Sequence, residues 1–226
     1  MLLLAVVSLR KTVGLHWLLS FVPFAFAITP AFLAERDFVR SIRWNGIFTA
    51  AHLVLVGIVL ALPLETFRRL SAYPSIVMGI RPATFMGALA AHGPGYTLAT
   101  GSYSQSAVLA YHARQPVLVF GRGSLHGRQY DLMTDFRDLD RTDILVVGDS
   151  LKPERIAPYF SRTEVSTTTV HGAEFVFVRG CDFRYGQYRR DVLLPILARY
   201  YTPPPWLPCG RNPLRERYTE GNGDEP

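Results

Sequence analysis

A group of charged side chains follows an apolar segment near the middle of this 226-residue chain. Residues 117–120 form a continuous apolar run, which is typical of a strand buried on both faces. Phosphate-binding loops occur directly after such strands, and four residues beyond this one could contact a ligand: Arg122, His126, Arg128 and Asp131. The same four side chains could instead form a charge network on the surface, and both interpretations stay open here.

The glycines in this turn do not match a known nucleotide-binding motif. Gly121, Gly123 and Gly127 follow the pattern G-x-G-x-x-x-G, whereas dinucleotide-binding proteins carry G-x-G-x-x-G and P-loops continue into Lys and Ser or Thr. A tight turn between a strand and a helix explains these glycines better. The sequence also contains no G-x-S-x-G motif, no H-E-x-x-H motif and no paired Cys/His set, which argues against a hydrolase triad and a zinc site.

A second candidate group lies near the N-terminus, at the start of a long apolar stretch. Arg10, Lys11 and His16 lie within seven residues, where cations can stay close to lipid head groups. Charge-assisted hydrogen bonds to phosphate are strong, so these residues are candidates for binding the phosphate of a lipid carrier. The alternative is that Arg10 and Lys11 anchor a helix end, with His16 as an interfacial residue beside the aromatic anchor Trp17.

Two apolar stretches are long enough to cross a bilayer. Residues 12–34 carry no formal charge, residues 44–64 form a second stretch, and residues 1–9 resemble a partial span; a full span needs about 20 residues. We therefore expect residues 1–64 to form a transmembrane region. The segment 35–43 between the spans holds three arginines and reads as a cytoplasmic loop by the positive-inside rule. The rest of the chain is then extracytoplasmic, and the protein is a multi-pass protein of the cell (inner) membrane.

Residues 65–208 have the pattern of a soluble α/β domain. Short apolar runs alternate with segments of helical periodicity, which predicts a mainly parallel sheet with a hairpin near its end. The expected strands are 96–100, 117–120, 143–147, 163–170 and 174–179, and the expected helices are 65–92, 102–112, 129–136, 151–160 and 188–201. The charged segment 209–226 is expected to be a disordered tail.

Charge and cysteine content narrow the functional classes. The net charge of +6 divides equally between residues 1–64 and the remainder, so no basic cluster indicates nucleic-acid binding. Cys181 and Cys209 match no metal-binding spacing. They are a possible disulfide in an oxidising compartment and two thiols in the cytosol.

Several segments, in their order along the chain, resemble one family of membrane enzymes. These are the glycosyltransferases with the GT-C fold that use polyprenyl-phosphate sugars, a family that includes protein O-mannosyltransferases and aminoarabinose transferases. The first matching segment, Ser8–Phe24, resembles a late transmembrane segment of the family. The others resemble its C-terminal soluble region: Tyr96–Tyr111, Phe120–Leu132, Asp143–Val147 and Tyr200–Leu207.

The resemblance implies a membrane-anchored C-terminal region of such a glycosyltransferase, with a polyprenyl-phosphate sugar as donor. Family members carry about ten or more spans and place their catalytic carboxylates in an early extracytoplasmic loop, which has no counterpart among these residues. We therefore expect a truncated or split enzyme that is inactive alone, with no catalytic residue assigned. Its partners would be membrane lipid and an N-terminal glycosyltransferase half or another membrane protein; a need for divalent metal is undetermined. The alternative is a stand-alone membrane-tethered module that binds a ligand or serves as a structural subunit of the cell envelope.

Overall fold

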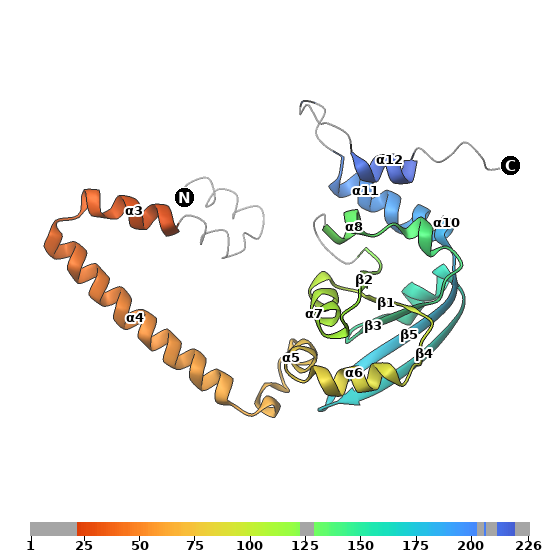
Figure 1. The fold of residues 1–226 in the computed structure, drawn as a ribbon, viewed down its shortest axis with the longest axis horizontal. Helices are drawn as coiled ribbons and strands as arrows, with labels where there is room; N and C mark the ends of the chain where they lie inside the picture. The colour runs from red at the N-terminus through yellow and green to blue at the C-terminus, as the bar shows by residue number, and fades with distance from the viewer. Residues whose placement is uncertain (1–21, 123–128, 203–205, 207–211, 220–226) are drawn as a thin grey trace. The chain divides into compact units, whose positions relative to one another are not determined.

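The computed structural model describes residues 22–122, 129–202, 206 and 212–219, and the chain divides into two compact units, Met1–Leu62 and Pro63–Pro226. Figure 1 shows both units as ribbons.

The first unit contains one helix that is long and apolar enough to cross a membrane. Helix α4 spans Glu35–Ala61, has 27 residues and buries none of them (Figure 1). At 1.5 Å per residue it is about 40 Å long, which exceeds the hydrocarbon core of a bilayer. The predicted span 44–64 therefore lies mostly within α4.

The expected loop 35–43 is wrong, because these residues form the first turns of α4. The segment contains no glycine or proline to interrupt the helix. The carboxylates of Glu35 and Asp37 lie in its first turn, where they interact favourably with the positive end of the helix dipole. The preceding helix, α3, spans Val22–Phe32 and covers only part of the predicted span 12–34. The partial span 1–9 and the rest of the first span lie outside the described residues, so a second span stays a prediction.

The second unit contains a five-stranded sheet in the order β2-β1-β3-β5-β4. Its strands are β1 (Thr97–Thr100), β2 (Leu118–Val119), β3 (Ile144–Gly148), β4 (Phe160–Val170) and β5 (Ala173–Phe183). Strand β1 pairs in parallel with both β2 and β3, as the alternating pattern predicts. Each of the five segments expected as strands overlaps one of these strands.

The sheet is mixed rather than mainly parallel, which corrects the sequence prediction. Strand β5 pairs antiparallel with both β3 and β4. The two-residue turn His171–Gly172 has φ angles of 48° and 77°, as a type I′ hairpin requires, and Gly172 adopts this backbone without strain. The hairpin was expected, but its strands are 11 residues each and extend the same sheet. Strands β4 and β5 therefore form the antiparallel part of the sheet.

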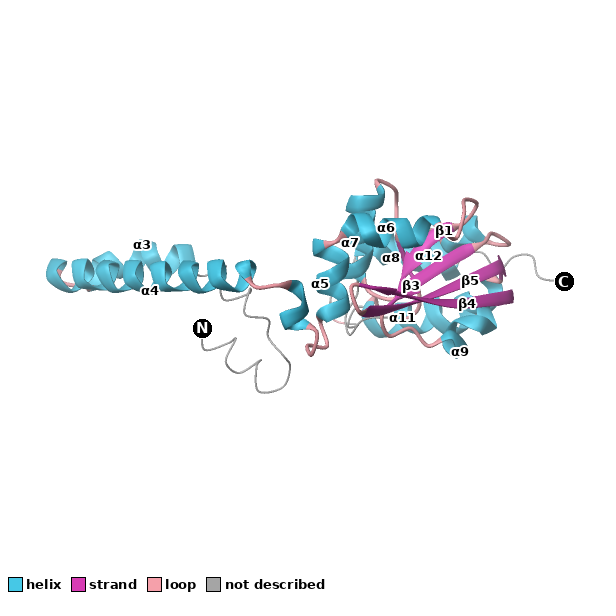
Figure 2. Cartoon of the chain, turned by 90° about the horizontal axis from the view of Figure 1, so that it is seen from below, coloured by secondary structure: helices cyan, strands magenta, loops and turns pink. Residues whose placement is uncertain are grey.

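Helices cover both faces of the sheet, so that the strands lie between two helical layers (Figure 2). On the first face, helices α5 (Tyr73–Ile80), α6 (Pro82–Ala90) and α7 (Tyr103–Ala113) pack around Phe175 and Phe177. The expected helix 65–92 is thus divided, with a 3₁₀ turn at Leu64–Phe67 and a break before Pro82, which begins α6. Alternate residues of β3 face the two cores: Leu145 joins this one and Val146 joins the other.

The second face carries the C-terminal half of the unit. Its elements include α8 (Gln129–Met133), α9 (Pro153–Ile156), α10 (Tyr185–Tyr188), α11 (Leu194–Tyr200) and α12 (Pro213–Thr219). Short 3₁₀ turns lie at Phe136–Leu139 and Ala157–Tyr159, and a π-helical turn at Arg189–Leu193 joins α10 to α11. Their core is aromatic: the Tyr188 ring lies 4.7 Å from Phe120 and 4.8 Å from Phe136, measured between centroids.

The expectation of a disordered tail is wrong for residues 213–219, which form α12. Leu214 and Tyr218 lie four residues apart and are both buried in the second core. The Tyr218 hydroxyl donates a hydrogen bond of 3.1 Å to the Thr134 carbonyl. Two apolar side chains on one face of an otherwise charged segment are therefore enough to pack this helix against the second core. Residues 209–211 and 220–226 lie outside the described part of the chain.

Candidate functional site

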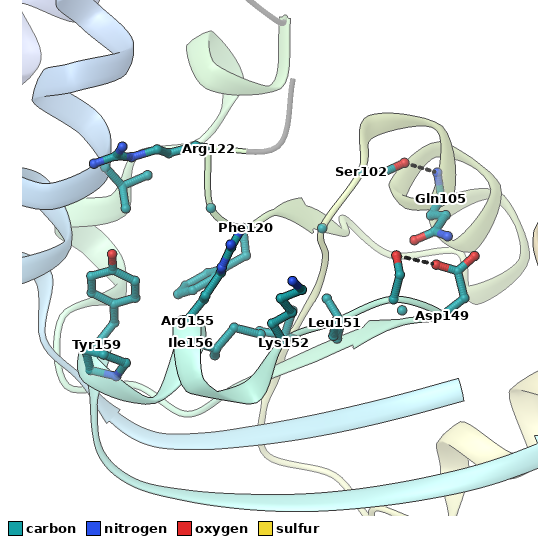
Figure 3. Close-up of a pocket in the computed structure, with 17 residues that line it drawn as sticks. Ser102, Gln105, Phe120, Arg122, Asp149, Leu151, Lys152, Arg155, Ile156 and Tyr159 are labelled. Carbon is teal, nitrogen blue, oxygen red and sulfur yellow. Dashed lines mark hydrogen bonds between the residues drawn. The ribbon is translucent and has the colours of Figure 1, made fainter. Parts of the chain in front are cut away.

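A crevice of about 860 Å³ opens at the carboxyl ends of the three parallel strands (Figure 3). Its lining includes Gly101 and Ser102 after β1, the segment 120–122 after β2, and the segment 148–152 from the end of β3 onward. Ligands of open α/β sheets bind outside the carboxyl ends of the strands. The volume also lies in the range of small-molecule sites, about 300–1,000 Å³.

The crevice coincides with a change in the direction of the chain connections. After β1 the chain enters α7, which packs on the first face, whereas after β3 it enters α9, which packs on the second. Neighbouring parallel strands whose connections leave on opposite faces separate their loops, and this opens a crevice between them. The site therefore follows from the strand order and needs no special motif.

The base of the crevice is apolar. Phe120, Val146 and Ile156 line it, and all three are buried. Leu151 folds back over the end of β3, and a Cβ atom at Gly148 would lie 2.9 Å from the Leu151 Cγ atom. Glycine at position 148 therefore allows this close approach. An apolar base with polar groups above it is the usual composition of a ligand pocket.

A buried polar network fixes the wall between β1 and β2. The Thr100 and Ser106 hydroxyl oxygens lie 2.8 Å apart, and the Ser106 hydroxyl donates to the Leu118 carbonyl at 2.7 Å. Ser102 caps α7, because its side-chain oxygen accepts a hydrogen bond from the Gln105 amide. This is the usual role of serine before a helix. The network joins the start of α7 to the edge strand of the sheet.

Three basic side chains line the crevice: Arg122, Lys152 and Arg155. The Arg122 guanidinium donates two hydrogen bonds to the Asp191 carbonyl oxygen, at 3.1 and 2.6 Å. Among the described residues, neither Lys152 nor Arg155 has a carboxylate within 4.0 Å. Among the described residues, Asp149 is the one acidic lining residue, and it accepts a 3.0 Å hydrogen bond from the Ser150 hydroxyl. The described lining residues therefore carry a net charge of +2.

Tyr159 lines the end of the crevice near Arg122, and the ring of Tyr188 packs against it. Burial raises the pKa of Tyr159, the Asp191 carboxylate raises it further and Arg122 opposes the rise. Tyr159 is therefore neutral at physiological pH and can act as a hydrogen-bond donor or acceptor. Behind it, the buried Tyr188 hydroxyl accepts a 2.8 Å hydrogen bond from the Gly121 amide, which fixes the loop that follows β2.

The described lining groups are suited to binding a ligand. Among the residues that the structure describes, no histidine or cysteine lines the crevice, and Asp149 is its one carboxylate. No group of three or more His, Cys, Asp or Glu residues in the described part of the chain could hold a metal ion. Cations, hydroxyl groups and an amide above an apolar base can hold a polar, anionic ligand.

Two of the four predicted ligand-binding residues, Arg122 and Asp131, belong to the described part of the chain, and one of them lines this crevice. Arg122 lines it, whereas Asp131 lies on α8 and accepts a 2.9 Å hydrogen bond from the Tyr201 hydroxyl. Asp131 is therefore not a lining residue. His126 and Arg128 lie outside the described residues, as do the lipid-phosphate candidates Arg10, Lys11 and His16.

The possible disulfide stays a prediction. Cys181 forms no disulfide with any described residue and Cys209 lies outside the described residues, so a bridge between them is untested. In the first unit, the Nδ1 atom of His52 lies 2.9 Å from the Phe48 carbonyl oxygen of the same helix, α4.

Sequence reasoning missed most of the crevice, including Ser102, Gln105, Asp149, Lys152 and Arg155. A usable signal was present, because the segments 101–105 and 148–155 directly follow strands that were expected from the sequence. The carboxyl ends of parallel strands meet at one edge. Reading all three strand ends together would have located the site. Comparisons of the chain with protein-family models, with characterised proteins and with solved structures found no match in any of the three.

Proposed function

We propose that the chain corresponds to the membrane-anchored C-terminal region of a polyprenyl-phosphate-sugar glycosyltransferase, and that its α/β domain binds the ligand without carrying out the transfer. The observation that supports binding is the crevice at the strand ends, with its net positive lining and apolar base. The family is proposed from the sequence resemblance. In this proposal the α/β domain lies on the extracytoplasmic side, where lipid-linked sugars are consumed.

The connection between the two units supports a role close to the membrane. Helix α4 ends at Ala61 and the second unit begins at Pro63, so Leu62 alone separates them. A tether of this length keeps the domain near whichever membrane surface the helix reaches. A ligand carried by a membrane lipid would therefore be present at a high effective concentration.

The direct test is calorimetric titration of the full chain in detergent micelles with a short-chain polyprenyl-phosphate hexose. We expect saturable binding and no sugar transfer to lipid or protein acceptors. Ser150→Trp places a bulky ring in the crevice lining and should abolish binding. Ser166→Trp is the matched control, because Ser166 is also an exposed serine but lies on β4, outside the crevice. Turnover by the chain alone, or unchanged binding by Ser150→Trp, would overturn the proposal.

A second candidate is a stand-alone membrane-tethered module that binds an envelope ligand. Its support is that every lining residue of the crevice belongs to the second unit, so the site needs nothing from the first. This candidate predicts that Ser150→Trp abolishes binding of a water-soluble envelope ligand while the polyprenyl-phosphate hexose does not bind at all. The same titrations therefore separate the two functions.

A further inference from the structure

The charged groups of the crevice are not evenly distributed. In Figure 3, Lys152 and Arg155 point up into the middle of the crevice, while Asp149 lies toward the side of Gln105 and helix α7. Ser150 donates its hydroxyl hydrogen bond to Asp149. Arg122 lies on the opposite side of the crevice, the side that also holds Tyr159. The crevice thus has a cationic part and a separate part in which a carboxylate is grouped with hydroxyl and amide side chains.

The cationic part is formed by the first turn of α9 and the residue before it. Lys152 is the extended residue that precedes the helix and Arg155 is the third helical residue, and Figure 3 shows both side chains pointing into the crevice. Both are exposed, and among the described residues neither has a carboxylate partner within 4.0 Å. Two cations that point into one crevice repel one another unless an anion lies between them. An anionic group of the ligand would supply the missing negative charge.

The other part of the crevice suits hydroxyl groups rather than an anion. Asp149 lies there with Ser150, Ser102 and Gln105. An ionised carboxylate only accepts hydrogen bonds, so it pairs with ligand hydroxyls and repels ligand phosphate. Serine hydroxyls and the glutamine amide can both donate and accept. A ligand with several hydroxyl groups would satisfy this part, and its negative group would be directed away from it.

We infer that the crevice binds a phosphorylated sugar, with the phosphate between Lys152 and Arg155 and the sugar hydroxyls at Asp149, Ser150 and Gln105. Phe120 and Ile156 at the apolar base would contact the C–H face of the sugar ring. This inference rests on the proposed function, because it takes the crevice to be the ligand site, and it adds the residues that hold each part of the ligand and the orientation of the ligand. The orientation of the ligand follows because the cations Lys152 and Arg155 attract its phosphate, whereas the Asp149 carboxylate repels phosphate and accepts hydrogen bonds from hydroxyl groups.

Two sources would present the same sugar-phosphate chemistry. A free hexose 1-phosphate is a monoester whose second ionisation has a pKa of about 6, whereas a polyprenyl-phosphate hexose is a diester and has no second ionisation. The affinity for the monoester should therefore fall as the pH drops from 7.5 to 5.5. The affinity for the lipid-linked diester should stay constant over that range. The stronger binder of the two at pH 7.5 identifies the source.

The test measures the affinity of the full chain in detergent for hexose 1-phosphate, the free hexose, inorganic phosphate and a short-chain polyprenyl-phosphate hexose. Lys152→Gln combined with Arg155→Gln should weaken binding of both phosphorylated sugars by about tenfold or more, since hydrogen bonds to charged groups are the stronger class. It should leave the affinity for the free hexose unchanged. Asp149→Asn should lower the affinity for the free hexose. The affinity for inorganic phosphate should stay the same or rise in this variant, because a repelling charge is removed.

Arg162→Gln is the matched control for the loss of an arginine, since Arg162 is 71% exposed on β4 and does not line the crevice. It should change none of the four affinities. Circular dichroism of each variant checks that the domain is folded. Equal affinity for hexose 1-phosphate and free hexose, or no effect of the double variant on either phosphorylated sugar, would overturn the inference. If Ser150→Trp still abolished binding of the free hexose in that case, the crevice would remain the ligand site and only the phosphate assignment would fail.

Discussion

Ser106→Ala should destabilise the domain because it removes one member of the buried network that joins β1, α7 and β2. Thr100 and Ser106 are both fully buried. The substitution leaves the Leu118 carbonyl without its 2.7 Å donor and removes a partner of Thr100. An unsatisfied buried polar group costs about 1–3 kcal/mol. Alanine is the better helix former by about 0.5 kcal/mol, so we expect a net loss of roughly 0.5–2.5 kcal/mol.

The assay is denaturation of the full chain in detergent, followed by circular dichroism. A loss of about 1.5 kcal/mol should lower the melting temperature of a domain of this size by about 3–6 °C. Ser104→Ala is the control, because Ser104 lies on the same helix but is exposed and bonds only the Ser102 hydroxyl. Thr100→Val with Ser106→Ala should cost less than the sum of the single changes, since the two hydroxyls share one network. If Ser106→Ala were as stable as Ser104→Ala, the network would not stabilise the strand edge.

Three further predictions concern acid stability, the cysteines and topology. The His92 ring stacks on Phe177 with centroids 4.5 Å apart, and its pKa is lowered by burial and then by the charge of Arg179. Below the unfolded-state pKa of about 6.5, the native state therefore binds fewer protons than the unfolded state. The contribution of His92 to stability is complete above that pH and is lost as the pH falls through the lowered native pKa. His92→Phe should abolish this loss, and urea denaturation at a series of pH values measures it. Thiol labelling of the unfolded, unreduced protein should find no free thiol if Cys181 and Cys209 are bridged, whereas two labelled thiols would exclude the bridge. A reporter fused after Pro226 should be active as an exported domain, and strong cytoplasmic activity would reverse the proposed topology.

The sequence predicted the elements of the domain well because each depends on local pattern. Four residues of the expected strand 143–147 form β3, since the apolar residues 144–147 alternate between the two cores. The expected helix 102–112 also corresponds closely to α7, which Ser102 caps. The direction of β5 in the sheet was not predicted, because strand pairing depends on contacts between distant segments rather than on local pattern.

The candidate site was harder to predict for the same reason. Arg122 was found because it follows an obvious strand. Lys152 and Arg155 line the same crevice only because β3 lies next to β1 in the sheet, and the strand order was not known from the sequence. Asp131 looked like a neighbour of Arg122 in the sequence, yet it pairs with Tyr201 on the C-terminal side of the domain. The helix α12 was missed because only Leu214 and Tyr218 in a charged segment carry its buried face.

Photo-crosslinking with a lipid-linked sugar shows whether the crevice is the ligand site. The full chain in detergent is irradiated with a polyprenyl-phosphate hexose that carries a photoreactive group on its sugar, and labelled peptides are identified by mass spectrometry. We predict labelling of the segments 101–105 and 148–159 that line the crevice, with loss of labelling in Ser150→Trp and in the presence of excess unlabelled lipid. Labelling confined to peptides of α4, or no specific labelling of the α/β domain, would contradict the account.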